Sequence, residues 1–381
     1  MKILHTSDWH LGKTLEGYSF HKEQESFLKE LIQVIKKENI DLILIAGDIF
    51  QSPNPKAESL QLFYKSLKAL ENRPAFIIPG NHDNAVGLSA VESLVRERGI
   101  IFAKSPSDII PPGDFNFYSI EKSAPGYVRL QIKGEPIDIL FMPYPTETSL
   151  NEIISEELTE PDIQRDYSKK IGMIFEKNLH RLTEDVINIA IGHFHISGGK
   201  STDSERDILK GGIYAVDLEN LPKVQYIAMG HLHRAQKTGN AYYSGSPLQY
   251  SKSEAGQKKY VLTIDLQPRV KPVVKSIPLT INKPIEVLKA ESIEEALRLT
   301  KTPSAGLTYI DLETTRVLSS EEVREMKANR EILGINPIFK EAEINFEKEK
   351  TLEEDFIQFY MERKGGEPHK KVVEKFLQLF I

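Results

Sequence analysis

Seven side chains between positions 8 and 233 are of the types that bind hard or borderline metal ions. Their ligand atoms are carboxylate oxygens, an amide oxygen and imidazole nitrogens, and each comes after a short apolar run. They are Asp8, His10, Asp48, Asn81, His193, His231 and His233. Seven ligands are too many for one tetrahedral ion. They fit two divalent ions about 3.5–4 Å apart that share one carboxylate, an arrangement that activates water for attack on phosphate.

The ligand types also narrow the choice of ion. The sequence contains no cysteine, which excludes thiolate zinc sites, disulfide scaffolds and cysteine nucleophiles. Carboxylate, imidazole and amide ligands together suit Mn²⁺ or Fe²⁺. Glycines such as Gly47 and Gly230 stand beside the ligands. They let the chain turn sharply after a strand, so that several backbone segments can crowd around the ions.

Short apolar runs precede the ligand clusters and must position them. The runs are 2–6, 42–46, 75–78, 187–191 and 226–229, with a further run at 139–142 that no ligand follows. Continuous rather than alternating apolar residues indicate strands buried on both faces. Residues 27–35 and 60–70 show helical spacing between such strands. The pattern predicts a layered α/β fold with the ligands at strand ends.

The chain divides at 278–284, where the ligand motifs stop. We predict a first domain over 1–280, a small α+β domain over 281–346 and a connector with two helices over 347–381. Runs at 260–266 and 273–277 have no helix between them and predict a second, partly antiparallel sheet. The alternating segment 339–346 predicts the last strand of the small domain.

The two C-terminal helices are predicted from end signals. Thr351 begins a capping-box pattern and Gly365-Gly366 ends the first helix. Apolar residues, among them Phe356 and Phe359, recur on one face of each helix. Helices of about 12–13 residues are marginal alone. The pair therefore needs a surface to pack on, either the chain's own domains or a partner.

Composition sets wider limits. Of 381 residues, 40% are hydrophobic and 27% are charged, which is typical of a chain that folds around a core. The net charge of −6 excludes a uniformly basic nucleic-acid coat but leaves a local basic groove open. The basic clusters near the motifs are Lys13 and Lys22; Lys200, Arg206 and Lys210; and Lys252, Lys258 and Lys259. No apolar run reaches membrane-spanning length and the first residues read as a strand, so we expect a cytoplasmic protein.

The motifs resemble those of calcineurin-type metallophosphoesterases over residues 1–280. They are Asp8-Trp9-His10, Gly47-Asp48, Gly80-Asn81-His82-Asp83, Gly192-His193 and Gly230-His231-Leu232-His233. Within that superfamily, segments 5–12, 46–50 and 79–83 and the long C-terminal extension are similar to SbcD-type nucleases of DNA double-strand-break repair. The resemblance implies a two-sheet sandwich flanked by helices, followed by a small α+β capping domain and a helical hairpin.

The resemblance also assigns roles to residues. It implies that the first ion is held by Asp8, His10, Asp48 and His233. It implies that the second is held by Asp48, Asn81, His193 and His231, with Asp48 bridging and Mn²⁺ as the ion.

Four further residues are candidates for the substrate side of the site. By resemblance, His82 contacts the scissile phosphate and helps the leaving oxygen depart, and Asp83 is the nearest candidate to support it. His21 is a candidate phosphate contact in the loop after the first motif. Gln51 stands where some relatives have a histidine, and it can only hydrogen-bond.

The implied function is Mn²⁺-dependent cleavage of DNA, as a 3′→5′ exonuclease on double strands and an endonuclease on single strands. The implied partners are DNA, a second copy of the chain and an ABC-type coiled-coil ATPase, SbcC, that binds residues 351–380. Apolar stripes at 60–70 and 88–95 would form the homodimer, or else pack on the chain's own sheet. The alternatives are a phosphatase or nucleotide phosphodiesterase, and a DNA-end scaffold whose main task is to hold the ATPase.

Overall fold

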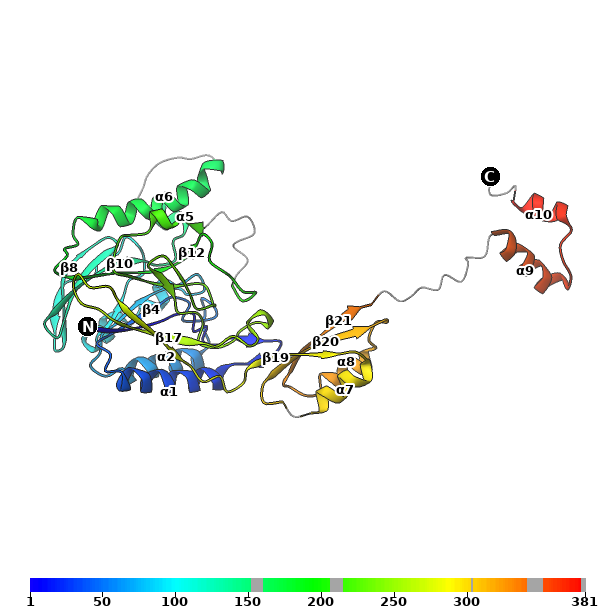
Figure 1. Ribbon diagram of the computed structural model, residues 1–381, viewed down its shortest axis with the longest axis horizontal. Coiled ribbons are helices and arrows are strands. Elements are labelled where there is room, and N and C mark those ends of the chain that lie inside the picture. The colour runs from blue at the N-terminus through cyan, green and yellow to red at the C-terminus, as the bar shows by residue number, and fades with distance from the viewer. Residues whose placement is uncertain (152–159, 206–214, 303, 341–351, 378–381) are drawn as a thin grey trace.

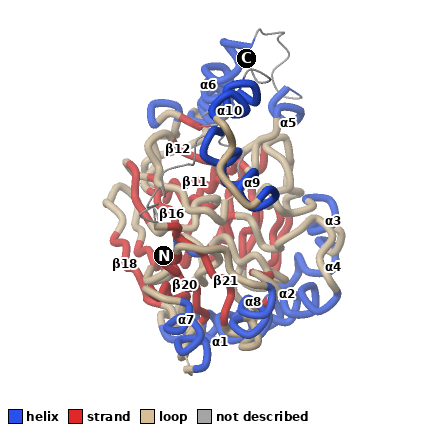
Figure 2. Tube along the Cα trace, turned by 90° about the vertical axis from the view of Figure 1, so that its right-hand side faces the viewer, coloured by secondary structure: helices blue, strands red, loops and turns tan. Residues whose placement is uncertain are grey.

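The computed structural model describes residues 1–151, 160–205, 215–302, 304–340 and 352–377 (Figure 1). Two large sheets lie face to face, and helices cover the outer face of each. Figure 2 shows the strands between α1 and α2 on one side and α5 and α6 on the other. The predicted layered α/β sandwich is confirmed. None of the described helices is long and apolar enough to cross a membrane.

The first sheet has six strands, and the four at one end of the order below, from β1 to β6, are parallel. Its order is β18 (Val273–Pro278), β17 (Tyr260–Asp265), β1 (Lys2–Thr6), β4 (Leu42–Ala46), β5 (Ala75–Ile78) and β6 (Ile100–Phe102). The outer face packs on α1 (His21–Lys37) and α2 (Ala57–Ala69) through Phe27, Leu31 and Phe63. These helices contain the two predicted helical segments.

The late strands β17 and β18 belong to this first sheet, so their assignment to a second sheet was wrong. β17 pairs antiparallel with β1, and β18 pairs antiparallel with β17. An antiparallel strand needs no crossover helix. The helix-free run therefore closes the free edge of the sheet in which the chain began.

The second sheet has eight strands. Its order is β15 (Gln236–Thr238), β16 (Ala241–Tyr243), β14 (Tyr226–Gly230), β11 (Ile187–His193), β10 (Glu135–Met142), β9 (Tyr127–Ile132), β8 (Tyr118–Ala124) and β7 (Gly113–Phe115). Its outer face packs on α5 (Glu147–Asn151) and α6 (Glu160–Leu179), with Ile171 and Phe175 in the contact. Short elements complete the sandwich: β2 (Thr14–Leu15), β3 (Tyr18–Ser19), α3 (Ala85–Ser89), α4 (Glu92–Val95), β12 (His195–Ile196) and β13 (Ala215–Val216).

Alternate residues of one strand fill different cores. Leu42, Leu44 and Ala46 of β4 point into the core between the sheets, whereas Ile43 and Ile45 point to the helices. All five are buried. A strand with both faces covered must be apolar throughout, which is why the continuous runs predicted these strands.

Residues 285–339 form a separate parallel sheet of three strands, β19 (Ile285–Ala290), β20 (Leu307–Thr314) and β21 (Ile332–Phe339), covered by α7 (Ile293–Lys301) and α8 (Ser320–Met326). The strand β21 ends at Phe339, where the predicted strand 339–346 begins, and residues 341–346 of that prediction lie outside the described residues. Asn336-Pro337 reads as a turn, but β21 is an edge strand, where a proline is tolerated.

The three-stranded sheet packs against the sandwich. Ile285, Leu307 and Leu333 share an apolar cluster with Phe20 and Tyr250 of the sandwich. An ion pair between Lys252 Nζ and Asp311 Oδ1, 2.6 Å long, lies beside this cluster. The segment that contains Tyr250 and Lys252 therefore contributes both an apolar contact and an ion pair to the three-stranded sheet.

The C-terminal helices α9 (Leu352–Lys364) and α10 (Lys370–Leu377) form a hairpin that stands apart in Figure 1. The rings of Phe356 and Phe376 stack 3.8 Å apart, which holds the helices together. Phe359 is 57% exposed and Val372 39%. The predicted helix start at Thr351 lies outside the described residues.

The predicted dimer stripes have different surroundings. Phe63 and Leu67 of α2 are buried in the core under the first sheet, as is Leu88 of α3. Leu94 of α4 is 76% exposed. Most of the first stripe is thus core, while the α3–α4 segment keeps an apolar residue on the surface.

Candidate metal centre

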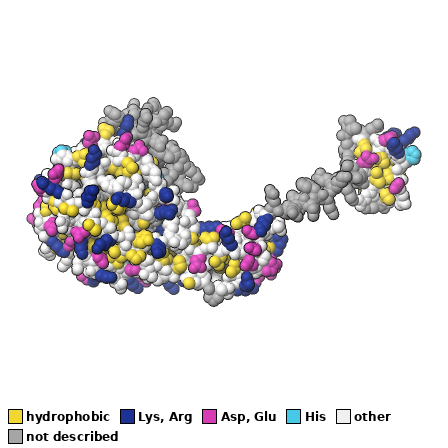
Figure 3. Space-filling model, in the orientation of Figure 1, with side chains coloured by type: hydrophobic (Ala, Val, Ile, Leu, Met, Phe, Trp, Pro, Cys, Tyr) yellow, Lys and Arg dark blue, Asp and Glu magenta, His cyan; other side chains and the backbone are white. Residues whose placement is uncertain are grey.

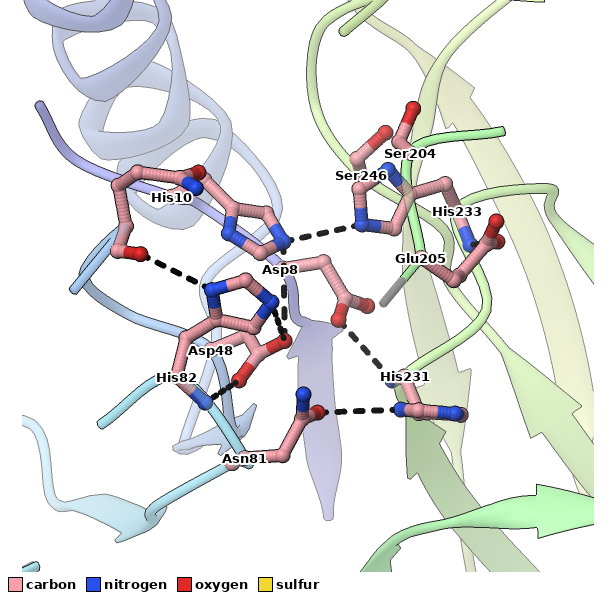
Figure 4. A network of polar contacts seen from close by, with 12 residues as sticks. Asp8, His10, Asp48, Asn81, His82, Ser204, Glu205, His231, His233 and Ser246 are labelled. Carbon is pink, nitrogen blue, oxygen red and sulfur yellow. Dashed lines mark hydrogen bonds and ion pairs between the residues drawn. The ribbon is translucent and has the colours of Figure 1, made fainter. Parts of the chain in front are cut away.

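The seven predicted ligands meet at the ends of strands from both sheets, and Figure 4 labels all of them except His193. Asp8 follows β1, Asp48 follows β4, and His193 ends β11. Four of these predicted ligands have backbone φ angles in the left-handed region: Asp8 (54°), His10 (45°), Asp48 (50°) and His231 (97°). Such conformations cost about 1–3 kcal/mol each and persist where the surroundings enforce them, often at functional sites.

The motif glycines lie where backbone segments approach closely, as the sequence predicted. A Cβ on Gly230 would lie 1.8 Å from the Ala46 carbonyl oxygen, which is shorter than any tolerated contact. Gly47 has φ +84°, and its Cβ would lie 2.3 Å from His193 Nδ1. Backbone from the two sheets therefore touches at this place, and only glycine fits.

His10 and His233 form one half of the cluster. Their Nε2 atoms are 2.9 Å apart, and both side chains are buried. Asp8 joins them: each of the three offers a ligand atom within 4.8 Å of the others. Two imidazole nitrogens at this distance need a proton or a cation between them, which fits a metal site.

Asp48 lies at the centre of the cluster. Its Oδ2 is 3.7 Å from His10 Nε2 and 3.5 Å from His193 Nε2. Its Oδ1 accepts a hydrogen bond from the His82 backbone N–H at 2.8 Å. One carboxylate oxygen thus faces histidines of both predicted ion sites, as a bridging ligand would.

Asn81 lies between His193 and His231 in the other half of the cluster. Its Oδ1 is 3.2 Å from both His193 Nε2 and His231 Nδ1. His193 Nδ1 lies 2.7 Å from the Ala46 carbonyl oxygen, and because a carbonyl only accepts, this nitrogen carries the proton. The lone pair of a neutral His193 then points at the oxygens of Asn81 and Asp48, which favours a cation among them.

His82 is fixed beside the cluster. Its Nδ1 donates to the Gln51 carbonyl oxygen at 2.9 Å, and its Nε2 lies 3.9 Å from Asp48 Oδ2. Gln51 thus acts on the site through its backbone, which its side-chain type could not reveal. His10, Asp48 and His82 also offer ligand atoms within 4.8 Å of one another.

Asp83 makes contacts different from those predicted. Its carboxylate accepts hydrogen bonds from the backbone N–H groups of Ile49 (3.1 Å), Phe50 (2.9 Å) and Gly80 (3.0 Å). It ties the two loops that carry Asp48 and Asn81. The carboxylate nearest to the His82 ring among the described ion pairs is that of Asp48.

His21 begins α1, and its backbone N–H donates to Ser19 Oγ at 3.4 Å. Its Nδ1 is buried and has no hydrogen-bond partner within the described part of the chain. It belongs to none of the clusters of possible metal ligands among the described residues. Its predicted phosphate contact stays a prediction.

The buried groups shift one another's pKa values. Burial raises the pKa of Asp8 to about 6 against the opposing effect of His193. Burial also raises the pKa of Asp48, but His193 and other histidines more than offset this and hold it well below its ordinary value. In return, Asp48 overcomes the effect of burial and raises the pKa of His193 to about 9.

Two further imidazoles are held neutral, whereas at His233 the neighbouring Glu254 overcomes the effect of burial and raises the pKa. Burial keeps the pKa of His10 well below its ordinary value, and burial with the charge of His193 lowers the pKa of His231 to about 3. Neutral imidazole is the form that binds metal, so these two ligands need no proton removed.

A group of buried charged residues lies behind His233 and was not predicted from the sequence. Glu254, Lys259 and Glu205 surround this histidine and are all buried. Glu254 and Glu205 follow no motif, and only their packing reveals them. Lys259 was placed in a basic surface cluster, which was wrong: it is 2% exposed and pairs with Glu254.

The predicted basic clusters are only partly described. Lys252, of the same cluster as Lys259, pairs with Asp311, and Arg206 and Lys210 lie outside the described residues. On the face shown in Figure 3, Lys and Arg side chains alternate with Asp and Glu. That face carries no single basic strip.

The chain belongs to the calcineurin-like phosphoesterase family, whose profile matches residues 1–235. Within that family it is similar along its whole length to SbcD, the D component of the nuclease SbcCD, of Bacillus subtilis (strain 168). The two are 38% identical over 396 residues, covering 100% of this chain and 97% of the relative.

Proteins of the same description match from two other bacteria. The one from Staphylococcus epidermidis is 28% identical, covering 76% of this chain and 73% of the relative. The one from Rhodobacter capsulatus is 31% identical, covering 73% and 71%.

Proposed function

We propose that this chain is the nuclease component of a DNA-repair complex of the SbcCD type and hydrolyses DNA phosphodiesters with the help of divalent metal ions. The full-length similarity to SbcD proteins supports the substrate class and the partner. The observation that carries the chemistry is the buried cluster in which His10 and His233 face each other at 2.9 Å around Asp48 and Asp8.

The residues present fit two divalent ions, which we propose to be Mn²⁺. Asp8, His10, Asp48 and His233 would hold the first. Asp48, Asn81, His193 and His231 would hold the second. When bound, two such ions lower the pKa of water and offset the charge of the phosphate.

The chain's own residues supply positioning and a proton. Gln51 holds His82 with its proton on Nδ1, so Nε2 is the atom that faces the cluster. We propose that a protonated His82 donates from Nε2 to the departing sugar oxygen, with Asp48 as the nearest compensating charge. Asp83 serves by fixing the loops that carry Asp48 and Asn81.

The remaining parts suit a large substrate and a partner. We propose that the sandwich over 1–280 cleaves, that the small domain over 281–346 contacts DNA, and that the hairpin binds the coiled coil of the ATPase. Two copies would associate through the exposed α3–α4 segment, where Leu94 is 76% exposed. A 3′→5′ polarity on duplex ends, single-strand endonuclease activity and a cytoplasmic location belong to the same proposal.

The test is a comparison of substrates with the purified full-length chain and Mn²⁺. Linear duplex and single-stranded circular DNA should be degraded, whereas p-nitrophenyl phosphate and cyclic nucleotides should be cleaved far more slowly. Labelled ends give the polarity. Efficient cleavage of the small esters without DNA degradation would favour a phosphatase or nucleotide phosphodiesterase instead. Metal-dependent binding of DNA ends with no cleavage would favour a scaffold.

A further inference from the structure

Glu254 is a fully buried carboxylate behind the candidate metal centre, on the 3₁₀ turn Lys252–Glu254. Its Oε1 lies 3.3 Å from His233 Nδ1, and its Oε2 lies 2.5 Å from Lys259 Nζ. A buried carboxylate is costly unless charge and hydrogen bonds compensate it. Here Ser251 Oγ and Ser246 Oγ, both at 3.2 Å, add further hydrogen bonds.

Lys259 is as well satisfied as its partner. Its ammonium group donates to Glu254, to the His233 carbonyl oxygen at 3.0 Å and to Ser246 Oγ at 2.9 Å. These three contacts use all three of its donors. Because a buried ion pair adds little net stability compared with apolar residues of the same size, its placement calls for another reason.

We look for the reason at His233, which makes contacts with three buried charged residues. Its Nδ1 faces Glu254, its carbonyl accepts from Lys259, and its backbone N–H donates to Glu205 Oε1 at 2.7 Å. A carboxylate on Nδ1 keeps the proton on that nitrogen, so Nε2 presents its lone pair toward His10. His193, the proposed ligand at the end of the neighbouring strand β11, has only a neutral carbonyl in the same place.

We propose that Glu254, held by Lys259, is a positioning residue that fixes the tautomer and orientation of His233 as a metal ligand. This inference rests on the proposed metal-dependent function. Outer partners of this kind typically change metal affinity by about 10–100-fold.

The experiment compares full-length variants in which the buried pair is replaced as a unit. E254M/K259M removes the acceptor without leaving an unpaired buried charge. E254Q/K259M retains an uncharged acceptor for Nδ1. K252M, in the same turn but paired with Asp311, is the matched control. The measurements are Mn²⁺ titration by calorimetry, ¹⁵N chemical shifts of the histidine nitrogens without metal, and thermal unfolding without metal.

We expect E254M/K259M to bind one ion about 10–100-fold more weakly and the other unchanged. His233 should become a mixture of tautomers, while the melting temperature without metal stays close to that of the wild type. E254Q/K259M should recover part of the affinity, and K252M should bind as the wild type does.

Two results would overturn the proposal. One is unchanged affinity for every ion in E254M/K259M. The other is an equal loss for every ion together with a lower melting temperature without metal, which a purely structural pair would produce. If the wild type binds Mn²⁺ but does not cleave DNA, the proposed function fails, and the same titrations still test the role of Glu254.

Discussion

The metal centre and the C-terminal hairpin reverse the usual distribution of residues. In the centre, charged and polar side chains such as Asp8 and His193 have no exposed surface. In the hairpin, the aromatic ring of Phe359 is 57% exposed. Burying unpaired polar groups and exposing apolar groups both cost free energy. The first pattern fits the proposed site for metal ions inside the fold, and the second fits the proposal that the ATPase partner covers the hairpin.

The strongest test of the buried side of this comparison is Asp48→Asn. It keeps the shape of the side chain but removes the charge that faces His10 and His193, so we expect cleavage to be abolished and Mn²⁺ binding to be lost or reduced to one ion. Calorimetric titration and duplex digestion measure both. Two ions bound with unchanged affinity would show that Asp48 does not bridge.

His82→Ser should separate chemistry from metal binding. Because His82 is proposed to donate a proton and not to hold an ion, cleavage should fall by about 10²–10⁴-fold while metal content stays at the wild-type level. Elemental analysis beside steady-state cleavage rates is the measurement. Loss of metal in this variant would make His82 a ligand, which its distance to Asp48 also permits.

The exposed side is tested by Phe359→Asp in the full chain. An aromatic anchor removed from a protein interface typically costs about 2 kcal/mol or more, on the order of 30-fold in affinity. We expect weaker binding to the ATPase partner and unchanged Mn²⁺-dependent cleavage by the chain alone. A shortened chain of residues 1–340 should behave the same way. Binding at undiminished affinity would show that the hairpin does not bind the partner and would favour packing on this chain's own domains.

The smallest effect is expected at the α3–α4 surface. Leu94→Lys should shift a dimer to a folded monomer, measured by sedimentation, with no loss of stability because the side chain is exposed. Leu60→Lys is the contrasting variant. Leu60 packs against the core under the first sheet, so the charge should lower stability by about 1–3 kcal/mol. A dimer that survives Leu94→Lys would place the interface elsewhere.

The sequence predicted the buried central strands and the polar residues at their ends. It predicted few of the features that depend on contacts between side chains far apart in the chain. Each central strand is apolar throughout because both its faces are covered, and its polar residues gather where it ends, so Asp48 and His193 were found together. Glu254 was missed because its proposed role depends on its contacts with Lys259 and His233. Neither the spacing of these residues nor a motif connects them in the sequence. The strand at 332–339 was not predicted, because Asn336-Pro337 reads as a turn anywhere but at a sheet edge.

The contact between His10 and His233 joins residues 223 positions apart, one from each sheet. The hydrogen bond from the His231 backbone N–H to Asp8 spans the same separation. A fragment that lacks either sheet therefore cannot assemble the cluster, because non-local contacts of this kind need both sheets to be docked. An ion that binds there reports that the whole sandwich has folded. At one hundred times its dissociation constant, it would also make unfolding less favourable by about 2.7 kcal/mol, so that quality control of the fold and loading of the cofactor become a single event.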